Sequence, residues 1–356
     1  MSPVSSRPSS VAMACRAVRP LLMILALFAL GAQAQSLLGF DEALRLAQER
    51  SHQLPAQDAA AGAAREMAVA AAQLPDPTIK AGITNLPIDG ADRFSLTRDF
   101  MTMRSIGVMQ ELTRGDKRQA RSARFEREAE VALAGRAMAL ANLQRDTAMA
   151  WLERYYREHM RELMRAQRDE ALRQVEAADA AYRGGRGAQA DLFAARSAVA
   201  QIDDRLQQID SEVATATTRL ARWVGERAGQ ALGPTPDQTN LWLAFADLET
   251  RLEDHPQIAL MARQEAAARA DADLAQANRR SDWSVELMFS QRGPAYSNMV
   301  SINLAIPWQW DRKDRQDREL SAKQATAEQV RLQREEALRE VVAGVRSALQ
   351  AWQSNR

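Results

Sequence analysis

The segment Arg183-Gly184-Gly185-Arg186-Gly187 places three glycines within four positions, between two long stretches of helical sequence. Glycine adopts positive φ values without steric cost, so this segment allows the chain to reverse direction sharply. The sequence therefore predicts a hairpin of two antiparallel helices, joined at an exposed tip that covers about 183–190.

The stretch before the glycines predicts one very long helix, about 116–182. It contains no proline and a single glycine, Gly135. Apolar residues recur along it at helical spacing, at Leu133, Ala137, Leu140, Ala148, Trp151 and Tyr155. At 1.5 Å per residue such a helix is about 100 Å long. An ordinary globular domain is therefore excluded.

The stretch after the glycines predicts a second helix, about 191–224, with a coiled-coil seam. Its apolar residues alternate strictly by three and four positions, at Leu192, Ala195, Val199, Ile202, Leu206, Ile209, Val213, Ala216, Leu220 and Trp223. Because this helix is about half as long as the first, another part of the chain must cover the rest of the long helix.

Two pairs of segments alternate apolar with polar residues, as β-strands with one apolar face do. The clearer pair covers about 282–309 and the weaker pair about 76–112. Their apolar positions are Trp283, Val285, Leu287, Phe289, Val300, Ile302, Leu304, Ile306 and Trp308 in the clearer pair, and Ile79, Ala81, Ile83, Ile106, Val108 and Leu112 in the weaker pair.

These segments approach the length of a transmembrane β-strand. Trp283, Trp308 and Trp310 stand near strand ends, where an aromatic girdle would lie. Ordinary hairpins on a soluble domain explain the same alternation, so periodicity alone leaves both interpretations open.

The order helix, strand, loop, strand and charged helix start occurs twice in the chain. The first repeat covers 35–240 and the second covers 241–356. In the second repeat the long helix, about 312–356, stops with the sequence before a corresponding tip is reached. We therefore expect an incomplete second repeat.

Residues 1–34 have the layout of a secretory signal peptide. Three arginines and no acid precede or flank the apolar run 21–30, which is followed by Ala32-Gln33-Ala34. The full chain has 47 Lys and Arg and 46 Asp and Glu. Removal of residues 1–34 leaves 44 basic and 46 acidic residues, a formal charge of −2. Because its positive and negative charges are nearly equal in number, we do not expect the chain to bind nucleic acid electrostatically.

Cys15 is the only cysteine and lies within this leader. A lipidated cysteine follows the apolar run, whereas Cys15 precedes it, which disfavours a lipid anchor there. The mature chain would contain no thiol, and this excludes thiol catalysis and thiolate metal sites.

Other polar residues offer weaker functional signals. His52, His159 and His255 each stand alone, without a second His or Cys at ligand spacing, so capping or solvent-exposed roles are favoured over a metal site. A basic run is interpreted as a solvated helix face near a periplasmic lipid surface; it comprises Arg114, Lys117, Arg118, Arg121 and Arg124. No nucleophile elbow, phosphate loop or paired carboxylates are present, so we expect neither an enzyme nor a cofactor.

The combined pattern resembles the TolC-like outer-membrane efflux family over essentially the whole mature chain. The most specific match is the tip, where the family's motif corresponds to Tyr182, Gly185, Ala188, Asp191 and Leu192. Asp191 either caps its helix or contacts an adaptor, and both roles are compatible. Three further segments resemble the branch that serves heavy-metal pumps: Asn85-Leu86-Pro87, Phe94-Ser95-Leu96 and the stretch 101–110.

This resemblance implies a mainly α fold with a small β part, in which long antiparallel coiled-coil helices accompany four transmembrane strands per protomer. It implies a homotrimer with one twelve-stranded barrel in the outer membrane and a large periplasmic helical part. The implied partners are outer-membrane lipid, a periplasmic adaptor that meets the tip, and an inner-membrane resistance-nodulation-division pump. The implied function is a passive efflux conduit, whose cargo is either heavy-metal cations or other toxic compounds.

Two rival interpretations remain. A periplasmic coiled-coil scaffold or an efflux adaptor also contains a long helical hairpin, but an adaptor would not repeat the strand pairs. The chain is alternatively a non-functional fragment of the channel, because the family's second tip and last helix have no counterpart here. On that ground we expect that it does not form a sealed tunnel alone.

Overall fold

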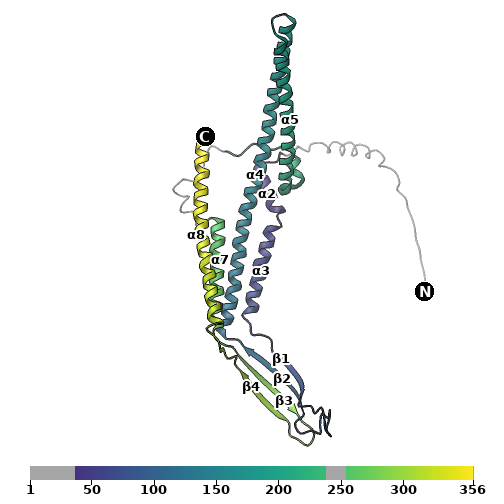
Figure 1. The fold of residues 1–356 in the computed structure, drawn as a ribbon, viewed down its shortest axis with the longest axis vertical. Coiled ribbons are helices and arrows are strands. Elements are labelled where there is room, and N and C mark those ends of the chain that lie inside the picture. Colours follow the sequence, from purple (N-terminus) through teal and green to yellow (C-terminus); the bar gives the residue numbers. More distant parts are fainter. Residues whose placement is uncertain (1–36, 238–253, 356) are drawn as a thin grey trace, which may run out of the picture. The chain divides into compact units, whose positions relative to one another are not determined.

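The computed structural model describes residues 37–237 and 254–355 (Figure 1). The signal peptide predicted for 1–34 lies outside the described residues. The elements follow the order α2 (Phe40–Arg50), α3 (Gln53–Ala71), β1 (Thr78–Thr84), β2 (Met103–Leu112), α4 (Gly115–Arg183), α5 (Gln189–Val224), the 3₁₀-helix η1 (Gly225–Gly229), α7 (Pro256–Asn278), β3 (Trp283–Gln291), β4 (Met299–Ala305) and α8 (Gln316–Ser354). Among the described helices, none has the length and apolar character needed to cross a membrane.

The chain divides into two compact units. Of the described residues, the hairpin unit contains 37–43 and Ala150–Pro236, and the sheet unit contains Leu44–Met149, Asp237 and 254–355. Helix α4, 69 residues long, contributes its first part to the sheet unit and its second part to the hairpin unit. In both units the long helices are the ones that the sequence predicts, and each of their bounds lies within a few residues of the expected one.

Helices α4 and α5 pack in the hairpin unit through the predicted seam. Leu192, Ile209, Val213, Ala216 and Leu220 are buried, and the other seam positions are half-buried: Ala195, Val199, Ile202 and Leu206. The last seam position differs, since Val224 is buried in place of Trp223. The Arg222 guanidinium covers the Trp223 ring at 4.6 Å from its centroid, which shields the indole without placing it in the seam.

The base of the hairpin unit is closed by the segment that precedes α2. Leu38 pairs with Leu232 in a parallel bridge, and its carbonyl oxygen accepts a hydrogen bond of 3.1 Å from Trp151 Nε1. Trp151 is fully buried and meets the Phe40 ring edge-on at 5.5 Å. Arg154 is also buried, and it donates to Glu158 and to the carbonyl oxygens of residues 228 and 230. A strand-like segment is thus locked onto the helical pair.

The predicted apolar stripe is wrong in the first part of α4. Leu133 and Ala137 are exposed, whereas Ala139 and Leu143 are buried. The reason is that α4 has a neighbour on two sides in the sheet unit. Arg136 pairs with Asp58 of α3, whereas Arg124 and Glu130 pair with Asp271 and Arg263 of α7. A helix packed on two sides buries small residues on both, so a single-stripe interpretation misplaces its core.

The four strands of the sheet unit form one antiparallel sheet in the order β1-β2-β3-β4. Strand β2 pairs with β3 although the whole α4–α5 hairpin and helix α7 separate them in sequence. Strand β4 ends at Ala305 rather than continuing to Trp308 as expected, because Pro307 has no N–H for a ladder. Helix α8 correspondingly begins at Gln316 instead of 312, after a turn in which Asp311 accepts from Asp314 N–H at 3.1 Å.

Candidate functional sites

One face of the sheet is a continuous apolar surface open to solvent. The register aligns Ile79, Val108, Leu287 and Ile302 in one row across all four strands. Ile79 is 74% exposed and Ile302 70% exposed. The next row aligns Ala81, Ile106, Phe289 and Val300. Contiguous exposed apolar area of this kind marks an interaction surface rather than an ordinary aqueous face.

The opposite face of the sheet is polar. Lys80 and Glu286 form an ion pair of 3.0 Å, although the register places Gly107 of β2 directly between their strands. Asn303 of β4 donates a further hydrogen bond to Glu286, at 3.4 Å. A Cβ atom on Gly107 would lie 2.8 Å from the Leu287 carbonyl oxygen, so this position requires glycine. The alternation that the sequence predicts thus separates an apolar face from a charged one.

The two outer strands each leave one edge unpaired by any described strand, since β1 pairs only with β2 and β4 only with β3. Unpaired backbone N–H and C=O groups at an edge favour the addition of another strand. In a nonpolar medium they must be paired, because no water is available to satisfy them. The described sheet is therefore open at both edges, and each edge can accept a further strand.

Loops at one end of the sheet are held against each other. Asn85 has a φ of +54° and Phe94 a φ of +56°. Asn85 tolerates this conformation, and its carbonyl oxygen accepts from the buried Thr102 hydroxyl at 3.0 Å, but the conformation is unfavourable for phenylalanine. Any Cβ on Gly293 would collide with the Thr97 carbonyl oxygen. The loop between β1 and β2 thus rests on the loop between β3 and β4.

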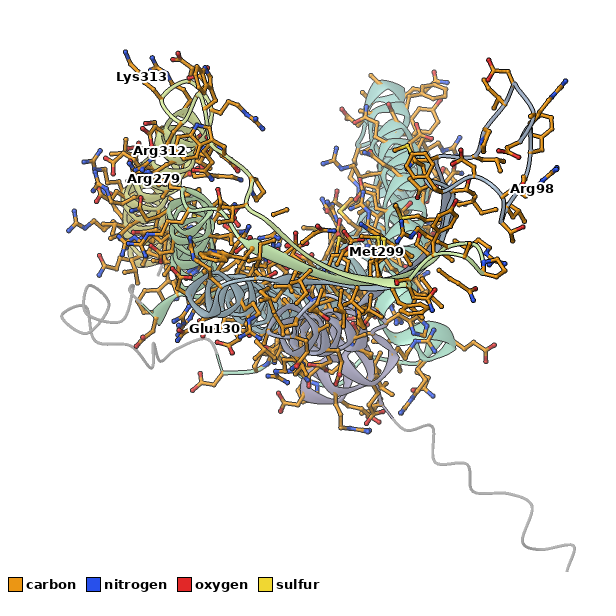
Figure 2. The ribbon with its side chains drawn as sticks, turned by 90° about the horizontal axis from the view of Figure 1, so that it is seen from below. Arg98, Glu130, Arg279, Met299, Arg312 and Lys313 are labelled. Atoms are coloured by element: carbon orange, nitrogen blue, oxygen red, sulfur yellow. The ribbon has the colours of Figure 1, made fainter. Side chains whose placement is uncertain are left out.

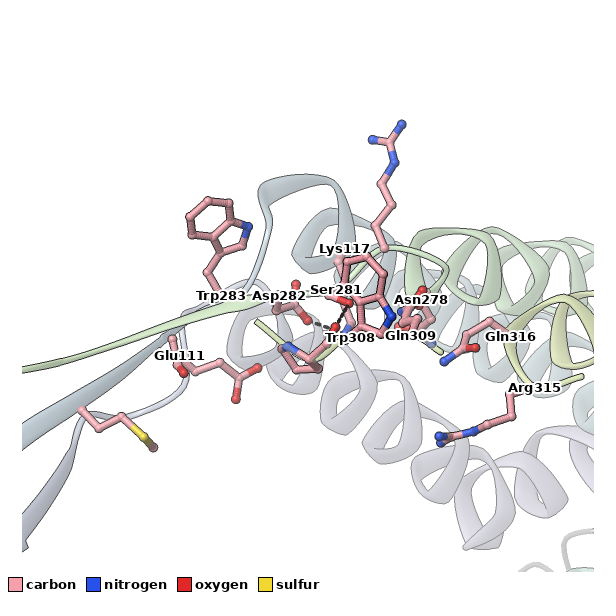
Figure 3. A pocket seen from close by; sticks show the side chains of 14 residues that line it. Glu111, Lys117, Asn278, Ser281, Asp282, Trp283, Trp308, Gln309, Arg315 and Gln316 are labelled. Atoms are coloured by element: carbon pink, nitrogen blue, oxygen red, sulfur yellow. Dashed lines mark hydrogen bonds and ion pairs between the residues drawn. The ribbon is translucent and has the colours of Figure 1, made fainter. Parts of the chain in front are cut away.

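A polar latch connects the other end of the sheet to α4. Lys117 Nζ lies 2.6 Å from Asp282 Oδ2 (Figure 3). Asp282 Oδ1 also accepts a hydrogen bond of 3.1 Å from Arg114 N–H. Burial of the Asp282 carboxyl raises its pKa, but the two hydrogen bonds together with the positive charges of Lys117 and Arg114 outweigh the burial. The pKa of Asp282 therefore lies below the ordinary value of 3.8.

The sequence pattern did not identify this latch. The pattern shows that a charged segment follows each strand pair, but it does not specify which carboxylate pairs with which ammonium group. The signal that could have found it is Asp282 itself, a single acidic residue directly before β3 that closely follows Arg279 and Arg280.

At the hairpin tip, α4 ends in a Schellman motif. Gly185 has a φ of +67°, Gly185 N–H donates to the Tyr182 carbonyl oxygen at 3.0 Å, and Arg186 N–H donates to the Ala181 carbonyl oxygen at 2.9 Å. The expected use of positive φ is thus confirmed at Gly185. Gly187 has no positive φ, but a Cβ there would lie only 3.2 Å from Ala181 Cβ, which is a tight contact.

Helix α5 begins with half of a capping box. Asp191 Oδ2 accepts a hydrogen bond of 3.2 Å from Ala188 N–H, while Ala188 has no side-chain acceptor to return it. Tyr182, Gly185, Ala188 and Asp191 are exposed. Leu192 is buried in the seam and is not accessible from outside the hairpin. The five motif residues therefore combine four accessible groups with one that fixes the helix pair.

The three histidines have different environments. His255 caps α7, since its Nδ1 accepts from Gln257 N–H at 3.3 Å. His52 occupies the same position before α3 but makes no side-chain cap. His159 is exposed, stacks on Tyr155 and lies 3.5 Å from Glu162. Within the described ranges, no three His, Cys, Asp or Glu side chains are grouped as a metal site would require.

The fold is similar to that of solved outer-membrane proteins. The outer membrane protein VceC of Vibrio cholerae matches with a TM-score of 0.70 at 18% identity, over 88% of this chain and 79% of VceC. CusC matches with a TM-score of 0.68 at 14% identity, over 88% of this chain and 76% of CusC. The CmeC outer membrane channel of Campylobacter jejuni matches with a TM-score of 0.68 at 9% identity, over 87% and 70% of the two chains.

Neither a protein-family model nor a curated protein sequence matches the chain. At identities of 9–18% the similarity establishes the fold. The chain is mostly helical with a small antiparallel sheet, as its resemblance to the TolC-like channels predicted.

Proposed function

We propose that this chain is the outer-membrane channel component of a tripartite efflux system. The observation that carries the proposal is the open sheet with two different faces. Its apolar face suits lipid and its polar face suits an aqueous lumen. Both of its edges have unpaired backbone groups that a further strand can pair with. The fold shared with solved outer-membrane channels supports the same function.

Closure of the sheet requires more than one copy. In the proposed homotrimer, β1 of one subunit pairs with β4 of the next, which gives twelve strands and leaves no edge exposed to lipid. In this barrel the apolar rows would face the lipid and the ion pair of Lys80 with Glu286 would face the lumen. Transmembrane barrels alternate apolar and polar residues along their strands in this way. Association is then a condition for membrane insertion.

The helical part of the proposed channel extends into the periplasm, where the hairpin tip meets an adaptor linked to an inner-membrane pump. Tyr182, Gly185, Ala188 and Asp191 are accessible for this contact, while Leu192 acts by holding the two helices together. Transport energy comes from the pump, and the chain acts as a passive conduit.

Heavy-metal cations are the proposed cargo, with other toxic compounds as the alternative. Support comes from the sequence of the β1–β2 loop, which resembles the branch that serves heavy-metal pumps. Asn85 and Phe94 of this loop hold the left-handed conformations described above. A conduit binds its cargo weakly, so these residues are proposed to shape the loop instead of acting as ligands.

The test is expression of the full chain in a bacterium that lacks its own channel of this class. We expect recovery in the outer-membrane fraction as a heat-modifiable trimer, and ion conductance after reconstitution into planar bilayers. Exclusive recovery as a soluble periplasmic monomer would overturn the proposal and favour a coiled-coil scaffold or adaptor. Membrane recovery without conductance would favour a non-functional fragment of a channel.

A further inference from the structure

Basic residues collect where the sheet meets the helices. The segments 111–124, 279–284 and 308–318 contain 11 Lys and Arg and 6 Asp and Glu, a net charge of +5. We call these three segments the basic collar. Contacts join these segments. The first meets the second through the ion pair of Lys117 with Asp282, and Arg114 donates to the Ala277 carbonyl oxygen just before the second segment. The second meets the third through Arg279, which pairs with Asp317 at 2.8 Å. A chain of nearly zero net charge thus concentrates positive charge in one place.

Not all of this charge is neutralised by neighbouring carboxylates. Lys313 and Arg315 make no ion pair with any described residue. Arg280 lies 4.0 Å from its nearest carboxylate, on Asp116, and its side chain is 78% exposed. Arg279, Arg312 and Lys313 lie together on one side of the sheet unit, away from Arg98 and Met299 (Figure 2). The collar therefore offers accessible cations to an anionic partner.

Two tryptophans in the same turn are almost fully exposed. Trp308 is 84% exposed and Trp310 90% exposed, and Trp310 N–H donates to the Trp308 carbonyl oxygen at 3.0 Å. They follow the end of β4, next to the apolar face. Indole rings prefer the boundary between hydrocarbon and headgroups, where one side is apolar and the N–H is hydrated. Their exposure in the chain by itself predicts such a boundary at the collar.

A pocket of about 410 Å³ opens within the collar. Its lining includes Trp308 and Arg315 (Figure 3). Arg280 is a second cation of the lining. Glu111 and Asp282 also line it, but Asp282 is neutralised by Lys117, so the pocket keeps a net positive charge. The Oε1 atom of Gln316, another lining residue, is buried and accepts no hydrogen bond within the described structure.

We propose that the basic collar binds the headgroup of an anionic phospholipid, of the phosphatidylglycerol class, at the membrane surface. The Arg280 and Arg315 guanidinium groups suit the phosphate oxygens of such a headgroup. Trp308 and Trp310 would lie at the hydrocarbon boundary beside it. This inference rests on the proposed membrane location and adds a lipid specificity to it.

The experiment uses the full chain in nonionic detergent, mixed with vesicles of phosphatidylcholine alone or with about a third phosphatidylglycerol, which gives the vesicle surface a negative potential. Co-flotation at low salt measures binding. We expect binding several-fold tighter to the anionic vesicles, and loss of this preference at high salt because the attraction is screened. Each cation removed should reduce the preference about five-fold, since one basic residue near a charged surface contributes about 1 kcal/mol.

The variants are Arg280→Gln with Arg315→Gln, and separately Lys313→Gln, an exposed residue whose replacement leaves the fold intact. The matched control is Arg186→Gln at the hairpin tip, also exposed and without an ion pair in the described structure; it should keep the full preference. Helical circular dichroism of every variant should equal that of the wild type.

The outcomes separate the two proposals. Equal binding to both vesicle types, or a preference that survives the collar variants, would overturn the lipid specificity and leave the channel proposal intact. Failure to bind either vesicle would count against both. Thermal stabilisation by inorganic phosphate as large as that by phosphatidylglycerol would show a free-anion site and overturn the assignment to lipid.

Discussion

Along the sheet, apolar side chains such as Ile79 and Ile302 face outward and the charged pair of Lys80 and Glu286 occupies the other face. Along the hairpin the arrangement is reversed: seam residues such as Leu220 lie inside, and ion pairs line the surface. Among these are Arg157 with Glu212 at 2.6 Å and Arg219 with Glu153 at 2.8 Å.

This difference teaches which surroundings each region needs. Exposed ion pairs contribute about 0–1 kcal/mol each, so the hairpin relies on its buried seam and remains compatible with water. The sheet has no second layer over its apolar face among the described residues, so its stability depends on a nonpolar exterior and on partner strands. Substitutions that affect one region and spare the other test this comparison.

The largest effect is expected from Trp151→Ala in the hairpin unit. It removes a fully buried indole and its hydrogen bond to Leu38, and should cost about 3–5 kcal/mol of unfolding free energy. Denaturant unfolding followed by circular dichroism measures the loss, and hydrogen exchange at Leu38 should rise with it. The control Trp223→Ala, at the edge of the seam, should cost less than half as much. Equal costs would contradict the packing described for Trp151.

A charge on the apolar face tests the sheet. Ile302→Arg should cost about 2–4 kcal/mol if this face lies in hydrocarbon, and the amount of heat-modifiable trimer in the outer membrane should fall more than ten-fold. Ser301→Arg, the adjacent residue on the polar face, should leave trimer recovery nearly unchanged. If both variants behave alike, the two faces do not have different surroundings.

The latch at Asp282 should respond to pH. Its folded-state pKa is lowered, so its stabilising contribution is present above about pH 4, the ordinary carboxyl range, and is lost as the pH falls through the folded-state value. Asp282→Asn should cost about 1–3 kcal/mol at pH 7 because Lys117 loses its charged partner. The stability difference between wild type and variant should shrink at pH 3. A difference independent of pH would exclude the ion pair as its cause.

The smallest effect concerns the tip. Gly185→Ala places a Cβ at a φ of +67° and should cost about 1–2 kcal/mol, read as faster hydrogen exchange in the last turn of α4. Gly62→Ala lies inside α3 with open space around it, and should stabilise by about 0.5–1 kcal/mol. Effects of the same sign at both positions would refute the left-handed geometry at Gly185.

Local patterns predicted much of this structure because local physics fixes it. The three-four spacing from Leu192 to Leu220 places one face of α5 against α4 whatever else the chain does. Period-two alternation likewise assigned Leu287 and Ile302 to the same face of the sheet. The end of β4 was missed although its cause, Pro307, is itself local, because the alternation continued through Trp308.

Other features depend on which elements become neighbours. The two helix-start histidines have similar sequence contexts, yet only His255 caps its helix. The burial of Ala139 and Leu143 instead of Leu133 follows from α3 and α7 lying on two sides of α4. At the tip, the accessibility of Tyr182 depended on the packed hairpin, whereas the burial of Leu192 follows from its position in the seam.

The sequence by itself determined the long helices, the reversal at the glycines and the two-faced strands, because helix and strand periodicities and glycine's freedom act over a few residues. Only the tertiary structure decided that β2 pairs with β3, that Asp282 meets Lys117, and that cations from three distant segments form one collar. Such contacts join residues separated by long stretches of chain, and their energies depend on partners and burial that no local spacing specifies.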